Sequence, residues 1–211
     1  MFSLLEIENE LKKRLAYPYK WGTKQTNQLD KKSNFIYKTF LFEDLLQKIE
    51  SAFKDEINYK DLQNYALNRW YNFHSAMAVE RIFRQHASVK KTANSKDKEK
   101  DFYINTVPFD HKTSVFPKRL NMTFNQAIND TKSVCEWLYK NQSQQGRFHL
   151  KNRLFILLFD RKGEHWKLKA NLQKLMEIIE NYLNNFDEKQ LTKIEFAKHE
   201  IALTDIIWLI N

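Results

Sequence analysis

The stretch that decides the fold of this chain is residues 100–112, which read KDFYINTVPFDHK. The pattern predicts two short strands joined by a turn at Asn105–Thr106, so that the start of the first strand lies beside the end of the second. Asp101 opens the first strand, whereas Asp110 and Lys112 close the second, two residues apart and therefore on one face. Two carboxylates and a lysine should thus converge. Carboxylates hold a hard divalent cation through oxygen, and a neighbouring lysine can act on attacking water or on a phosphate.

An Asp, a short gap and then Asp-x-Lys across a hairpin resembles the PD-(D/E)xK nuclease superfamily, which includes many restriction endonucleases. In that family the elements run helix, strand, hairpin, helix, strand, helix, strand, and the first helix carries a Glu. The chain offers the same order over roughly residues 65–210. Around the hairpin its candidates are a helix at 70–86, a strand at 88–92, a helix at 123–140, a strand at 153–159, a helix at 166–186 and a strand near 206–209. The departure is Lys100, which stands where the motif name has Pro.

The resemblance implies an α/β fold, restriction-endonuclease-like, with a mixed central β-sheet flanked by helices. It implies that Asp101, Asp110 and the backbone carbonyl of His111 bind Mg²⁺ or Mn²⁺, that Glu80 assists them, and that Lys112 positions the nucleophile. The expected substrate is DNA.

Two of these residues have ordinary alternatives. Glu80 can pair with Arg84 four residues on, which is worth about 0.3–0.5 kcal/mol on an exposed helix. Lys112 can be one of the many lysines that reach water from a strand end. The ring of His111 points away from the face of Asp110, so we expect it to pack or to make a hydrogen bond.

Composition indicates a folded chain in a reducing compartment. It has 211 residues, of which 42 % are hydrophobic and 14 % aromatic, with three Gly and three Pro. These values are typical of a chain with a substantial core and long regular elements. The single Cys135 excludes an internal disulfide framework. The first residues carry charge too early for a signal peptide, and no apolar run reaches the length of a membrane span, so we expect a cytoplasmic protein with no membrane partner.

Charge indicates a polyanionic partner. The chain has 35 Lys and Arg against 26 Asp and Glu, a formal net charge of +9. Phosphate neutralisation by such a protein releases counterions and favours nucleic-acid binding. Part of the charge leads directly into the hairpin, at Lys90, Lys91, Lys96, Lys98 and Lys100. The alternative is a solvated loop between strands.

The residues before the predicted core look like a helical addition. Apolar stripes predict amphipathic helices at 2–15 and 42–53, and the intervening 16–40 reads as a loop with many aromatic residues. We therefore expect an extension over 1–58, packed on a nuclease-like domain over 59–211. The two stripes could form a homodimer interface, or they could pack on the chain's own core.

Other catalytic classes lack their motifs. One Cys excludes the usual structural zinc sites, and the sequence has neither a phosphate-binding Gly-rich loop nor a Gly-x-Ser-x-Gly elbow. A polar segment, Gln144 to His149, could hold the scissile strand or be a simple turn. We predict a Mg²⁺-dependent endodeoxyribonuclease, such as a type II restriction endonuclease or a related defence or repair nuclease. The alternatives are a non-catalytic nucleic-acid-binding module that keeps the fold, and a basic protein with a protein partner.

Overall fold

The computed structural model describes residues 2–92, 100–141, 151–197 and 200–211. The chain forms two compact units. Unit 1 comprises Met1–Val79 with Lys169–Gln173, and unit 2 comprises Glu80–Leu168 with Lys174–Asn211. The division between the two units falls inside the longest helix, α4 (Tyr59–Gln85), where the sequence carries no linker.

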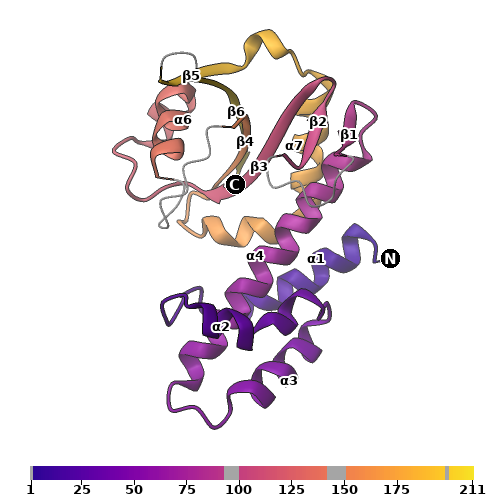
Figure 1. Cartoon of the computed structure of the whole chain (residues 1–211), viewed down its shortest axis with the longest axis vertical. Helices are drawn as coiled ribbons and strands as arrows, with labels where there is room; N and C mark the ends of the chain where they lie inside the picture. Colours follow the sequence, from indigo (N-terminus) through magenta and orange to yellow (C-terminus); the bar gives the residue numbers. More distant parts are fainter. Residues whose placement is uncertain (1, 93–99, 142–150, 198–199) are drawn as a thin grey trace. The chain divides into compact units, whose positions relative to one another are not determined.

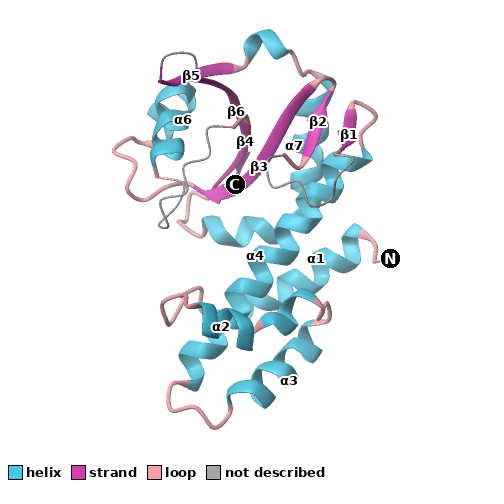
Figure 2. Cartoon of the chain, viewed as in Figure 1, coloured by secondary structure: helices cyan, strands magenta, loops and turns pink. Residues whose placement is uncertain are grey.

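Unit 1 is helical (Figures 1 and 2). The two predicted amphipathic helices are present. Between them, the expected loop over 16–40 contains two further short helices, which the sequence analysis missed. The elements are α1 (Leu4–Lys13), η1 (Arg14–Ala16), α2 (Asn27–Lys32), η2 (Asn34–Tyr37), α3 (Phe42–Phe53) and the first part of α4.

The missed helix α2 depends on caps and distant contacts. The Thr26 hydroxyl accepts a hydrogen bond from the backbone N–H of Leu29, 3.2 Å away, which caps the helix. Tyr65 and Arg69 of α4 bind Asp30 of α2. A six-residue helix is marginal by itself, so these contacts from α4 explain why it forms.

The apolar stripe of α3 is used inside unit 1. Phe42, Leu45, Ile49 and Phe53 are buried there. The stripe therefore packs on the chain's own core, one of the two alternatives that the sequence left open. The homodimer stays a prediction, and the apolar face of α3 does not support it.

Unit 2 is built on a six-stranded mixed sheet with the order β1-β2-β3-β4-β6-β5. The strands β1, β2 and β3 are antiparallel neighbours, β3, β4 and β6 run parallel, and β5 is antiparallel to β6. The strands are β1 (Val89–Lys91), β2 (Phe102–Ile104), β3 (Val107–Val115), β4 (Arg153–Phe159), β5 (Thr192–Ala197) and β6 (Glu200–Ile210).

The predicted hairpin is confirmed. Ile104 pairs with Val107 and Phe102 with Phe109, so the two-residue turn is Asn105–Thr106. Asn105 has φ +54°, the left-handed conformation that tight hairpin turns require and that Asn tolerates.

Helices in unit 2 are more broken than expected. The predicted helix over 123–140 is two helices, α5 (Phe124–Asn129) and α6 (Thr131–Lys140). Asp130 leaves the helical conformation between them, and its carboxylate accepts a hydrogen bond from the backbone N–H of Ser133. The predicted helix over 166–186 is a 3₁₀ segment, η3 (His165–Ala170), followed by α7 (Leu172–Asn184).

The sheet is also larger than expected. Strand β5 was missed, and β6 extends well beyond the predicted 206–209. Lys193 and Glu195 of β5 are exposed, as charged residues of an edge strand usually are, and they weaken the apolar signal of the strand.

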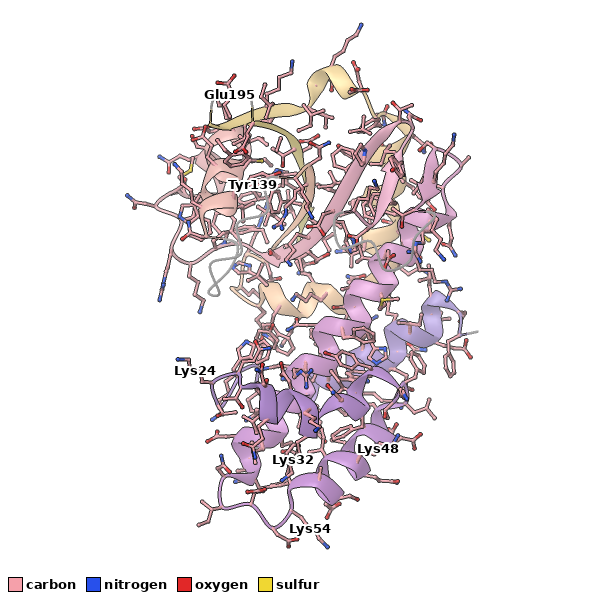
Figure 3. All side chains as sticks on the ribbon, viewed as in Figure 1. Lys24, Lys32, Lys48, Lys54, Tyr139 and Glu195 are labelled. Carbon is pink, nitrogen blue, oxygen red and sulfur yellow. The ribbon has the colours of Figure 1, made fainter. Side chains whose placement is uncertain are left out.

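Helices cover both faces of the sheet within unit 2 (Figure 1). Tyr139 of α6 extends toward the sheet and contacts Phe155 of β4, with ring centroids 5.6 Å apart (Figure 3). On the other face, the Tyr182 hydroxyl of α7 donates to Asp205 of β6. The predicted α/β class, with a mixed central sheet flanked by helices, is thereby confirmed. Among the described residues, no helix is both long and apolar enough to cross a membrane.

Candidate functional site

The hairpin brings the two predicted aspartates within electrostatic range of each other. At this end of the β2–β3 ladder, Phe102 pairs with Phe109. Asp101 precedes β2, and its N–H donates to the Phe109 carbonyl over 2.8 Å, one residue out of the ladder register. The Asp101 carboxylate contributes to raising the pKa of Asp110. That the two carboxylates share one cation stays a prediction.

The Asp101 carboxylate is held by His111. Its Oδ2 accepts from the His111 backbone N–H at 2.9 Å and lies 2.7 Å from Nδ1 of the ring. The ring itself stacks near Phe102 and Phe83. The expected hydrogen bond of this histidine ring is therefore present. Because the N–H and C=O of a strand residue point to the same side, the His111 carbonyl is directed toward the side of Asp101; its role as a cation ligand stays a prediction.

Asp110 has a cation from the next strand as its neighbour. It is paired in register with Arg153, the first residue of β4, and its Oδ2 lies 3.1 Å from Arg153 Nε. Lys112, two residues along β3, has its side chain on the same face and is exposed.

The environments of the two carboxylates shift their pKa values in opposite directions. Burial opposes ionisation of Asp101, but the hydrogen bonds and charge of His111, together with Lys112, outweigh it and lower the pKa. Burial raises the pKa of Asp110; Arg153 and Lys112 oppose this, whereas the Asp101 carboxylate adds to it. Lys112 is thus close enough to act on both acids. A group whose neutral form is favoured by burial gains from any further cation placed beside it.

Glu80 is not brought to the aspartates by any described contact. It forms the ion pair with Arg84 that was the ordinary alternative for this residue. Three residues on, Phe83 stacks on Phe102 with ring centroids 4.6 Å apart, so this end of α4 packs on the face of β2 that carries Phe102. The assisting role of Glu80 stays a prediction.

Basic and aromatic side chains share the face of Asp110. Lys90 of β1 pairs with Tyr103 of β2, and Tyr103 pairs with Pro108 of β3, two residues before Asp110. The period of two along each strand places these side chains on one face. Lys90 is exposed, Tyr103 is half-buried, and Lys100 Nζ lies 5.2 Å from the centre of the Tyr103 ring.

Sequence reasoning missed Arg153 and Tyr139. Arg153 is 4 % exposed, and its guanidinium carbon lies 6.0 Å from the centre of the Tyr139 ring. The position of a charged residue at the start of an otherwise apolar strand was a signal that could have identified Arg153. Its pairing with Asp110 could not be predicted in this way, because the register between β3 and β4 joins residues 43 positions apart. Several other candidates lie outside the described residues, namely Lys96, Lys98 and the segment 144–149.

The residues present suit a hard cation in their donor chemistry. Asp101 and Asp110 each have Oδ2 engaged, by His111 and by Arg153, and both supply oxygen, the ligand that Mg²⁺ prefers. Within the described ranges, no set of three or more His, Cys, Asp or Glu side chains is grouped as a metal site. A cation here would therefore need backbone, water or phosphate oxygens in addition to the two carboxylates.

A cavity of about 390 Å³ lies elsewhere in unit 2, lined by the end of α7 and by β6. It contains Asp205, whose pKa is raised by burial. Asp205 pairs with Leu154 in β4, one residue out of phase with Arg153, and so faces away from Asp110. This cavity is not part of the predicted site.

Comparison of the chain with protein-family models, with curated proteins and with solved structures finds no match.

Proposed function

We propose that this protein is a Mg²⁺- or Mn²⁺-dependent endodeoxyribonuclease with a restriction-endonuclease-like core. The observation that carries the proposal is the pair of part-buried carboxylates, Asp101 and Asp110, at one end of a hairpin and within electrostatic range of each other and of Lys112. The element order supports it: α4, then β1, the hairpin, α5 and α6, and a parallel β4, as the resemblance implied. A type II restriction endonuclease or a related defence or repair nuclease fits this description.

The side chains have distinct tasks in this proposal. Asp101 and Asp110 would hold the cation, with the His111 carbonyl and Glu80 assisting. When bound, such a cation supplies a water of lowered pKa and neutralises charge on the phosphate. His111 fixes the orientation of Asp101 through two contacts to one oxygen. Lys112 stabilises charge that develops on the phosphate, or orients the attacking water.

DNA is the proposed substrate because its backbone complements the charge around the carboxylates. The chain has a net charge of +9, and Lys90 and Lys100 lie on or beside the face that carries Asp110. Tyr103, between these lysines, presents an aromatic ring on which a base or sugar can stack. The lysines offset the repulsion between the acids and the phosphates.

Plasmid cleavage in Mg²⁺ tests the proposal. Asp110→Ala and Lys112→Ala should each abolish cleavage, because these groups act on the reacting phosphate. DNA binding, measured in Ca²⁺, should remain within a few-fold of wild type, because affinity is distributed over many phosphate contacts. Lys54→Ala, an exposed lysine of unit 1, is the control and should cleave normally. If Lys112→Ala cuts a panel of plasmid and single-stranded DNA at the wild-type rate, the role given to this lysine is wrong.

A melting assay separates the nuclease from the non-catalytic alternative. Mg²⁺ or Ca²⁺ should raise the melting temperature of the wild type, and Asp110→Ala should remove that increase. A wild-type protein that binds DNA, shows no cation-dependent stabilisation and cuts nothing would instead be a nucleic-acid-binding module.

A further inference from the structure

Arg153 is a buried cation, and two of its N–H donors have no hydrogen-bond acceptor among the described residues. It is 4 % exposed, and its Nε lies 3.1 Å from Asp110 Oδ2. Even so, neither Nε nor Nη1 has a hydrogen-bond partner within the described part of the chain, although both atoms are shielded from water. The contact with Asp110 is thus an ion pair by distance without the angle of a hydrogen bond. A buried donor left unpaired costs about 1–3 kcal/mol.

The other fully buried arginine shows what a structural role looks like in this protein. The Nη atoms of Arg14 in unit 1 donate to the carbonyls of Tyr17 and Pro18, at 2.8 and 2.9 Å, and to Asn68 Oδ1 at 2.6 Å. Arg14 therefore closes a loop with its guanidinium. Arg153 makes no comparable set of bonds among the described residues, and it lies instead beside the Asp110 carboxylate.

The Arg153 guanidinium lies beside an aromatic ring, a contact that uses neither the Nε nor the Nη1 hydrogen-bond donor. The Tyr139 ring lies 6.0 Å from the guanidinium carbon, and the Tyr139 hydroxyl is committed to the Lys151 carbonyl at 2.6 Å. A guanidinium that lies beside an aromatic ring and has unpaired N–H donors is suited to binding a planar or tetrahedral oxyanion. An additional carboxylate would add negative charge beside Asp101 and Asp110, which already repel each other. A phosphate that arrives together with a divalent cation would add no net negative charge.

We propose that Arg153 binds a nonbridging oxygen of the phosphodiester that is cleaved at this site. This inference rests on the proposed nuclease function for the identity of the phosphate. Once a movement of the surrounding side chains exposes Nε and Nη1, the phosphate oxygen would supply the acceptor that these atoms lack, and Asp110 would keep the guanidinium directed toward the site. Arg153 would then stabilise charge on the phosphate from the side of β4, while Lys112 does so from β3.

The first test follows the arginine itself and requires no catalysis. In ¹⁵N-labelled wild-type protein, the Nε–H signals of Arg153 and Arg14 are followed by NMR during titration with inorganic phosphate, and then with a short DNA duplex in Ca²⁺. We expect Arg153 to shift with both and to saturate at a lower concentration of duplex, with Arg14 unchanged. A shift with free phosphate alone would mean that the ligand is a small phosphate rather than DNA. An unmoved Arg153 signal, or equal shifts of both arginines, would overturn the proposal.

The second test uses variants and a sulfur-substituted substrate. Arg153→Met should slow cleavage by about 100-fold, the usual loss when one donor to a reacting oxyanion is removed, whereas Arg153→Lys should retain part of the rate. Replacing the contacted nonbridging oxygen by sulfur should slow the wild type, and this penalty should shrink in Arg153→Met. A structural role would leave the sulfur penalty unchanged. Arg161→Met, an exposed arginine past the other end of β4, is the matched control.

The two tests distinguish the possible failures. A wild-type protein that cuts no DNA defeats the proposed function, yet the phosphate titration still decides whether Arg153 binds the anion. If Arg153→Met fails to fold, as judged by its melting temperature, Arg153→Lys and the titration of the wild type keep the inference testable. Active wild type with an unchanged sulfur penalty in a folded Arg153→Met would reject the role of Arg153 and leave the proposed function standing.

Discussion

At the scale of single residues, the two aspartates of the hairpin differ in the direction in which their pKa values are shifted. The pKa of Asp101 is lowered, so its ionised form stabilises the fold at pH values above its ordinary pKa of 3.8. That stability is lost as pH falls through the lowered pKa. The pKa of Asp110 is raised, so its ionised form costs stability above the raised value, and the cost disappears below 3.8.

The two amide variants should therefore shift stability in opposite directions. At pH 7, Asp101→Asn should lower the free energy of unfolding by about 1 kcal/mol, because the amide keeps an acceptor but loses the charge-assisted bond to His111. Asp110→Asn should raise it at the same pH. Urea unfolding between pH 3 and pH 7 checks both: the Asp110→Asn difference should vanish below pH 3.8, and the Asp101→Asn difference should shrink only as pH falls through the lowered pKa of Asp101. Equal destabilisation by both variants at pH 7 would contradict this account.

At the scale of elements, the turn of the hairpin sets the register that pairs Phe102 with Phe109, the neighbours of Asp101 and Asp110. Asn105 has φ +54°, and its N–H donates to the Ser88 carbonyl at 2.8 Å. Asn105→Ala should cost about 1 kcal/mol, because a β-carbon disfavours this conformation unless the side chain is Asn or Asp. Asn105→Gly should be within a few tenths of wild type. Thermal unfolding measures both, with Thr106→Ala as the neighbouring control; an alanine variant as stable as the glycine variant would mean that the turn tolerates either.

At the scale of the whole molecule, the two compact units should separate stability from catalysis. Ile49 in unit 1 and Phe155 in unit 2 are both buried. Ile49→Ala should cost about 2–5 kcal/mol through a cavity in unit 1, and leave kcat for DNA cleavage unchanged well below the melting temperature. Phe155→Ala should cost about 3–5 kcal/mol and also lower kcat, because Phe155 pairs with Lys112 in the β3–β4 ladder. The wild type, assayed at equal folded concentration, is the reference; loss of kcat in Ile49→Ala would show that the site needs unit 1.

Local patterns in the sequence determined the hairpin, α3 and β4. The Asn105–Thr106 turn and the alternation of Phe102, Ile104, Val107 and Phe109 are short-range signals, so the pairing of Phe102 with Phe109 followed from a register counted out from a two-residue turn. The bounds of α3 and β4 followed equally from an apolar stripe and an apolar run. None of these depends on a residue far away in the chain.

The tertiary structure alone decided which distant residues join the carboxylates. Arg153 meets Asp110 through a parallel strand pairing that needs a long crossover, and no local pattern records that register. The short helix α2 forms against Tyr65 and Arg69. Glu80 pairs with Arg84, although the resemblance to the nuclease superfamily implied that Glu80 would assist in binding the metal ion. The physical reason is the same throughout. Turns and periodic patterns depend on a few neighbouring residues, whereas the partner of a buried charge depends on packing between strands that are far apart in the sequence.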